Sequence, residues 1–97
     1  MNREAMAVSV GNNFDEYGEY GLSVWSEPGL TAQQIHAKYL YRYPRARASS
    51  AGKVRGLGYE LKPTHGSGHY DIMFSDEPND TDWDKLDEAF DIALRYP

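Results

Sequence analysis

The chain has 97 residues, of which 40% are hydrophobic and 13% aromatic, and its net charge at pH 7 is −5. This much large apolar surface excludes an intrinsically disordered segment, and the length allows one hydrophobic core, so we expect a single domain over residues 1–97. The absence of cysteine excludes a disulfide framework and a thiolate zinc site. No apolar stretch is long enough to predict a signal peptide or a membrane span, so we expect a cytoplasmic protein without membrane contact.

Two short segments near the start of the chain alternate apolar residues with small or polar ones. The first holds Met6, Val8 and Val10, and the second begins with Tyr20 and continues over 20–26. A two-residue period is typical of half-buried strands, and the Gly- and Asn-rich stretch between the segments is typical of a turn. The sequence therefore predicts strands at 6–10 and 20–26.

Helical periods follow in the middle of the chain. Thr31 and Gln34 form a capping box, which predicts a helix over 31–41 that ends before Pro44. A second, short helix ending at Gly56 or Gly58 is indicated by apolar residues at every third position, with a serine to cap it. These residues are Ala48, Ser49, Ser50, Ala51, Val54 and Leu57.

A β-hairpin is the clearest local prediction, over residues 58–74. Apolar and polar residues alternate on both sides of a five-residue turn at 64–68. We expect one side of this hairpin to face the core, with Tyr59, Leu61, Tyr70, Ile72 and Phe74. His69 and Asp71 then lie exposed on the other side, beside Glu60 and Lys62.

The C-terminal segment has the pattern of an amphipathic helix. Thr81 is the predicted cap, and Trp83, Leu86, Phe90 and Leu94 form one stripe. The predicted order is β-β-α-α-β-β-α, an α+β domain with an antiparallel sheet.

Charge is distributed unevenly along the chain. Residues 38–62 hold seven basic residues against Glu60 alone, whereas the rest of the chain carries three basic and fourteen acidic residues. The segment 38–47 interleaves basic and tyrosine side chains, which suits phosphates and stacked bases. The candidate phosphate contacts are Arg42, Arg45, Arg47, Lys53 and Lys62. Alternatively, these arginines are solvated surface, or the basic and acidic parts neutralise each other in the fold, and the sequence leaves this open.

The hairpin residues also carry a family resemblance. Gly58-Tyr59-Glu60-Leu61 followed by Gly66-Ser67-Gly68-His69-Tyr70 resembles HicA-like toxins, which are small ribonucleases with a fold akin to double-stranded-RNA-binding domains. The resemblance implies that the protein binds RNA and that His69 is the catalytic histidine, with Gly66 and Ser67 shaping the turn before it. That family has a third strand before its last helix, where this chain has an acidic loop at 75–80, so the third strand would come from residues 20–26.

A second resemblance uses some of the same residues. Leu30–Ile35, a second helix that reaches Leu57-Gly58-Tyr59 and the hairpin after it look like the helix-turn-helix and wing of winged-helix domains. This resemblance implies a DNA-binding regulator with Arg45, Arg47 and Lys53 on the recognition helix, and with Lys62 and His65 on the wing.

An exposed His69 with Asp71 two residues along also suits a general acid or base, although an exposed histidine at a hairpin is often plain surface. Whether the protein is an enzyme stays open. No spacing of His36, His65 and His69 with carboxylates matches a metal motif, so we expect no metal and no cofactor.

A protein partner is the alternative to nucleic acid. The region 76–91 is strongly acidic, and Asp84, Asp87 and Asp91 lie at helical spacing within it. Such a face suits an antitoxin, an immunity protein or a phage-encoded inhibitor that covers a basic site by mimicking a row of phosphates. The same residues equally suit a solvated helix, and the sequence leaves the substrate, the partner and the oligomeric state open.

Overall fold

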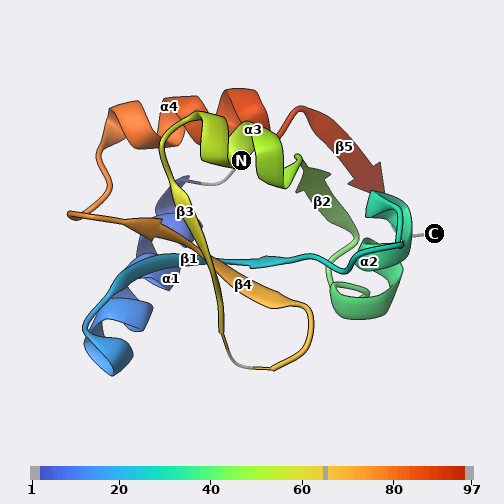
Figure 1. Ribbon diagram of the computed structural model, residues 1–97, viewed down its shortest axis with the longest axis horizontal. Coiled ribbons are helices and arrows are strands. Elements are labelled where there is room, and N and C mark those ends of the chain that lie inside the picture. The colour runs from blue at the N-terminus through green and yellow to red at the C-terminus, as the bar shows by residue number, and fades with distance from the viewer. Residues whose placement is uncertain (1–2, 65, 96–97) are drawn as a thin grey trace.

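The computed structural model describes residues 3–64 and 66–95, in which helices and strands alternate along most of the chain (Figure 1). In chain order these elements are α1 (Arg3–Tyr17), β1 (Tyr20–Trp25), α2 (Ala32–Tyr39), β2 (Arg45–Ala48), α3 (Ala51–Gly56), β3 (Glu60–Pro63), β4 (His69–Phe74), α4 (Asp80–Ala89) and β5 (Ile92–Arg95). An α+β fold with antiparallel sheets is confirmed, whereas the predicted order of elements is not. None of the helices within 3–64 and 66–95 is long and apolar enough to cross a membrane.

The main sheet has the strand order β1-β4-β3, and both pairings are antiparallel. Ile72 in the central strand β4 lies opposite Leu22 of β1 and Leu61 of β3. The predicted hairpin is therefore confirmed, with β3 and β4 as its strands. Residues 20–25 form the third strand of this sheet. They are the segment from which the HicA-like resemblance would need to draw its third strand.

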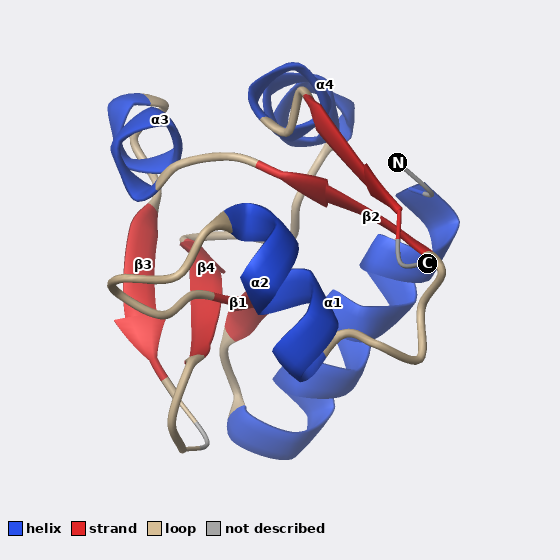
Figure 2. Cartoon of the chain, turned by 90° about the vertical axis from the view of Figure 1, so that its right-hand side faces the viewer, coloured by secondary structure: helices blue, strands red, loops and turns tan. Residues whose placement is uncertain are grey.

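The hydrophobic core lies on one face of this sheet, under α3 and α4, with α1 beside the edge strand β1 (Figure 2). Its buried apolar side chains are Val10, Leu22, Val54, Ile72, Phe74, Trp83 and Leu86. The Phe74 ring meets Tyr59 and Trp83 edge-on, with centroids 5.2 and 5.9 Å apart. Such aromatic pairs stabilise a core beyond the area they bury. Of the predicted core side of the hairpin, Ile72 and Phe74 are buried, and Tyr59, Leu61 and Tyr70 are partly buried.

The predicted strand at 6–10 is wrong, because these residues lie in α1. Met6 and Val10 are also four residues apart, which places them on one helix face, and both pack against the core. Val8, which the strand pattern grouped with them, is 59% exposed. Phe14, four residues after Val10, continues the same helix face, and its ring stacks on the Tyr20 ring with centroids 4.3 Å apart. The contacts of this segment therefore follow the helical period and not the two-residue period.

Two segments for which the sequence predicts no strand are strands in the fold. Residues 45–48 form β2 and residues 92–95 form β5, and the two pair antiparallel with Arg45 opposite Arg95. The predicted short helix that a serine caps and that ends at Gly56 is confirmed as α3, with Ser50 as its cap, whereas the last helix stops at Ala89, before the end of its predicted stripe. Neither segment carries a local strand signal, because each is stabilised by a partner far away in the sequence.

The remaining helix boundaries follow their caps. The predicted capping box of Thr31 and Gln34 is present at the start of α2. The cap of α4 is Asn79 rather than Thr81, and Asn79 and Asp82 form a second capping box. Because Asp80 and Asp82 sit in the first turn, their charge also favours the positive end of the helix dipole.

Leu86 tests the core directly. Truncating this fully buried side chain to alanine removes contacts with the sheet, and we expect Leu86→Ala to lower the free energy of unfolding by about 2–5 kcal/mol in urea titrations. The matched control is Ile92→Ala, at a residue that is 50% exposed, for which we expect a loss under about 1 kcal/mol. Equal losses at both positions would contradict the core described here.

Candidate functional site

Two exposed tyrosines and three arginines gather around the connection from α2 to β2. The five residues are Tyr41, Arg42, Tyr43, Arg45 and Arg95, and we call them the tyrosine–arginine strip. Tyr41 and Tyr43 are 52% and 61% exposed. The guanidinium of Arg42 lies over the Tyr41 ring, 5.8 Å from its centroid. Exposed aromatic rings grouped beside cations form a surface on which a ligand with flat rings and negative charge can bind.

Arg45 and Arg95 face each other across the β2–β5 pair. Both side chains are exposed, and neither forms an ion pair with any residue in the described ranges. Like charges directly opposite in an antiparallel pair repel each other, which costs stability. An anion with several oxygens, placed between the two guanidinium groups, would remove this repulsion.

Helix α2 holds the two segments that carry the strip, which are the loop before β2 and the end of β5. The buried His36 places its Nε2 2.7 Å from the Tyr43 carbonyl oxygen, and because a carbonyl only accepts, Nε2 carries the proton. Gln33 donates from its side chain to the Arg95 carbonyl oxygen at 3.3 Å. The backbone of the tyrosine loop and the end of β5 are thus tied to the same helix.

Three of the five predicted phosphate contacts are held by carboxylates. Arg47 donates to Asp87 at 2.5 Å, and the Nζ atoms of Lys53 and Lys62 lie about 3 Å from the carboxylates of Asp91 and Glu19. Only Arg42 and Arg45 of that set stay outside ion pairs within the described part of the chain. Arg45 and Arg47 lie on strand β2, so the expected placement of both on a recognition helix is wrong, and only Lys53 lies on α3.

The predicted acidic face is likewise paired. Asp84 accepts from Arg3, Asp87 from Arg47 and Asp91 from Lys53. The hydrogen bond from Lys53, followed by its charge, holds the pKa of Asp91 below its usual value. The basic and acidic segments therefore meet in the fold at Asp87 and Asp91, where they neutralise each other, while Asp84 is paired with the N-terminal helix.

His69 is not exposed, which corrects the prediction for this residue. The residue is 8% exposed, its ring meets Trp25 edge-on with centroids 4.6 Å apart, and Nδ1 lies 2.8 Å from Thr64 Oγ1. Tyr39 of α2 stacks on Trp25 from outside, with centroids 5.1 Å apart. A Cβ at Gly68 would lie 2.6 Å from the Tyr39 ring, so the backbone before His69 passes directly beneath that ring.

Asp71 is buried on the same side of the sheet. Ser23 donates to its Oδ1 at 3.4 Å. A Cβ at Gly21 would lie 2.6 Å from Asn13 Nδ2 and 3.1 Å from Cβ of Asp71, so α1 closes over this end of the strand. The alternating pattern predicted one covered face for β4, whereas side chains from α1 and α2 cover the second face as well.

A network around Glu27 keeps Tyr39 in place. The Glu27 carboxylate accepts hydrogen bonds from Lys38 Nζ at 2.7 Å and from the Tyr39 hydroxyl. The hydrogen bonds from Lys38 and then from Tyr39 hold the pKa of Glu27 below its usual value. The hydrogen bond between Tyr39 and Glu27 also raises the pKa of Tyr39. The end of α2 is thereby fixed to the loop that precedes it.

The sequence missed Arg95 as a site residue, because only the β2–β5 pairing places it beside Arg45. The wing residue His65 lies outside the described residues. In the ranges 3–64 and 66–95, no three His, Cys, Asp or Glu side chains are grouped as metal ligands would be.

Comparisons with known proteins identify no relative from which a function could be inferred. No protein-family model matches the chain, and no curated protein or solved structure matches it. The function must therefore be argued from the geometry.

His69 can be tested as a packed residue. Because its ring is buried against Trp25, we expect His69→Gln to lower the free energy of unfolding by about 1–3 kcal/mol through lost packing and a disturbed hydrogen bond to Thr64. Thr64→Val, which removes that hydrogen bond alone, should cost less. An unchanged melting temperature in His69→Gln, together with loss of an RNA-cleaving activity, would instead favour the catalytic role that the HicA-like resemblance implies.

Proposed function

We propose that the protein binds single-stranded nucleic acid on the tyrosine–arginine strip. The observation that carries the proposal is the facing pair of Arg45 and Arg95, exposed and without an acidic partner among the described residues, next to the exposed tyrosines of one loop. The pair supplies a place for a phosphate, and the tyrosines supply faces for bases.

The phosphate part of the proposal is supported by guanidinium chemistry. Arginine presents a planar fork of donors that matches phosphate oxygens, and two such forks facing each other can hold one phosphate or two successive ones. The net charge of the whole chain is −5, so general attraction to a polyanion is absent. Binding must therefore depend on this local cluster.

The single-stranded part is supported by the tyrosines. In a duplex the base faces are stacked on each other, whereas a single strand offers them to aromatic side chains. Tyr41 and Tyr43 lie two residues apart in one loop, and the cation of Arg42 already rests on one of the rings. Stacking of this kind contributes about 1–3 kcal/mol per base without selecting a sequence.

The residue set differs from the one predicted from the sequence. Arg42 and Arg45 remain and Arg95 joins them, whereas Arg47, Lys53 and Lys62 would first have to leave their carboxylate partners. The ribonuclease activity implied by the HicA-like resemblance stays a separate prediction, as does a protein partner for the acidic region. No observation on Asp84, Asp87 or Asp91 favours that partner, since each is held by a basic side chain.

Fluorescence anisotropy with a labelled single-stranded RNA or DNA, titrated at several salt concentrations, tests the proposal. Each phosphate contact on a single strand contributes about 0.7 to the slope of log K against log salt, so Arg45→Ala with Arg95→Ala should reduce the slope by about 0.7 where the pair holds one phosphate and by about 1.4 where it holds two. The matched control is Arg55→Ala, which removes an exposed arginine of α3 outside the strip and should leave the slope unchanged.

The tyrosines are tested in the same assay. Tyr41→Ala with Tyr43→Ala removes the stacking of two bases, about 2–6 kcal/mol in total, so single-strand binding should weaken at least about 30-fold while the salt slope stays the same, because stacking involves no counterions. Double-stranded nucleic acid should bind weakly to the wild-type protein and to the double tyrosine variant alike. The proposal is wrong if wild-type protein binds no single strand at low salt, or if Arg55→Ala weakens binding as much as the strip variants do.

A further inference from the structure

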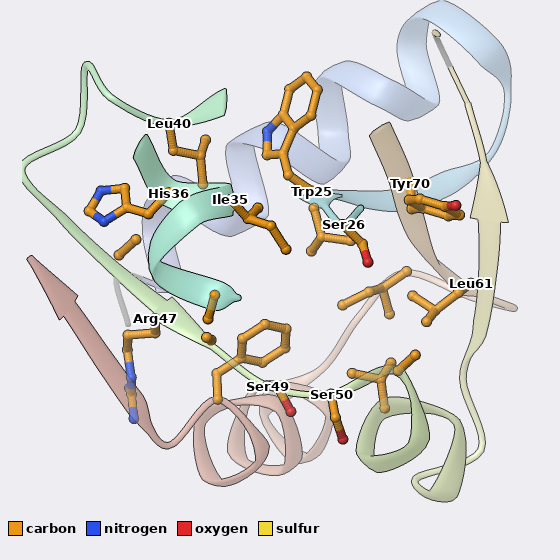
Figure 3. Close-up of a pocket in the computed structure, with 18 of the residues that line it drawn as sticks. Trp25, Ser26, Ile35, His36, Leu40, Arg47, Ser49, Ser50, Leu61 and Tyr70 are labelled. Atoms are coloured by element: carbon orange, nitrogen blue, oxygen red, sulfur yellow. The ribbon is translucent and has the colours of Figure 1, made fainter. Parts of the chain in front are cut away.

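A cavity of about 410 Å³ lies between α2 and the core face of the main sheet (Figure 3). Its walls are mainly aliphatic and aromatic, and they come from elements far apart in the sequence. Side chains on these walls include Ile35, Leu40, Val54, Leu61, Ile72 and Phe90. A volume of this size lies within the range of small-molecule sites in proteins.

The charged and ionisable side chains of the lining, His36, Arg47 and Arg55, bond to other residues or extend to solvent. Figure 3 shows the His36 ring and the Arg47 side chain directed away from the centre of the cavity. His36 bonds to the Tyr43 carbonyl, and Arg47 bonds to Asp87. Arg55 reaches the lining but is exposed to solvent. An ionised ligand group inside would lose its hydration without gaining a buried partner, so the cavity selects against charge.

Neutral hydrogen-bonding groups are nevertheless present. Ser26 and Tyr70 lie on the same side of the cavity in Figure 3, and neither hydroxyl makes a hydrogen bond within the described part of the chain. Ser49 also lines the cavity, and its buried Oγ has no hydrogen-bond partner among the described residues. Buried hydroxyls are normally satisfied, so the Ser49 hydroxyl favours a ligand group that completes its hydrogen bond, while the hydroxyls of the exposed Ser26 and the partly buried Tyr70 are accessible to the same ligand.

Several residues of the lining, Ser26 and Ser50 among them, are exposed, so the cavity opens to solvent and a small ligand can enter it. Water is a poor filler where most of the wall is apolar. We propose that the cavity binds a small, uncharged molecule with an apolar ring or chain and one hydrogen-bonding group. This site is independent of the nucleic-acid proposal, because it uses none of the five strip residues.

Indole is a suitable probe, because it is apolar, uncharged and carries one N–H donor. In a two-dimensional amide NMR titration we expect saturable shifts centred on Val54, Leu61 and Ile72, together with a melting temperature that rises with indole concentration. Ala32→Leu places a larger side chain in the lining and should weaken indole binding at least about tenfold. The matched control is Ala37→Leu on the same helix, at an exposed position outside the lining, which should leave binding unchanged.

Each other result overturns the proposal. Shifts spread over the surface, or equal weakening by Ala32→Leu and Ala37→Leu, would mean that indole binds elsewhere. Tighter binding of indole-3-carboxylate than of indole would contradict the uncharged class. Concentration-dependent dimerisation that removes indole binding would assign the cavity to a second copy of the chain. Should Ala32→Leu fail to give a folded amide spectrum, Ala48→Val on β2 makes the same test by adding less volume to another part of the lining.

Discussion

The antiparallel pairing of β2 with β5 brings the basic segment of the chain close to the acidic residues of α4 and of the turn that precedes β5. Arg47 then reaches Asp87, and Lys53 reaches Asp91, both near this pair. The same register sets Arg45 opposite Arg95 and turns Ala46, Ala48 and Leu94 inward to the cavity. The charge pattern of the surface, the candidate binding strip and part of the cavity wall all depend on this one pairing.

Which charges stay unpaired matters more here than how many charges there are. A basic segment of seven residues looks like a broad phosphate-binding surface, yet several of its cations are already bonded to carboxylates. Exposed ion pairs of this kind contribute little to stability, but they do occupy the donors that a phosphate would need. Of the arginines left over, Arg42 and Arg45 lie on or next to the loop of the exposed tyrosines, whereas Arg55 lies apart on α3, so the combination of arginine and tyrosine defines a small site rather than a large one.

The central strand β4 carries polar side chains that the fold encloses. His69 and Asp71 alternate with the core residues, and the face of the sheet on which they lie is covered by Trp25, by Tyr39 and by α1. A histidine held by Thr64 and an aromatic ring is well suited to fix the start of a strand. Its chemistry as a general acid or base would require solvent or substrate to reach a ring that is nearly covered.

The sequence alone determined the features that depend on neighbours in the chain. The hairpin of β3 and β4, the strand at 20–25 and the start of α2 follow from alternation and from a capping box, because these signals act within a few residues. The alternation of basic residues and tyrosines after α2 also indicated the loop that carries three of the five strip residues, Tyr41, Arg42 and Tyr43.

Only the tertiary structure decided the rest. Met6, Val8 and Val10 fit both a strand and a helix, and packing of Met6 and Val10 on the core selected the helix. The segments 45–48 and 92–95 have no strand signal of their own, and each became a strand through its partner. Ion pairing at Asp84, Asp87 and Asp91, burial of His69 and the placement of Arg95 all arise between residues distant in sequence, where local periodicity holds no information.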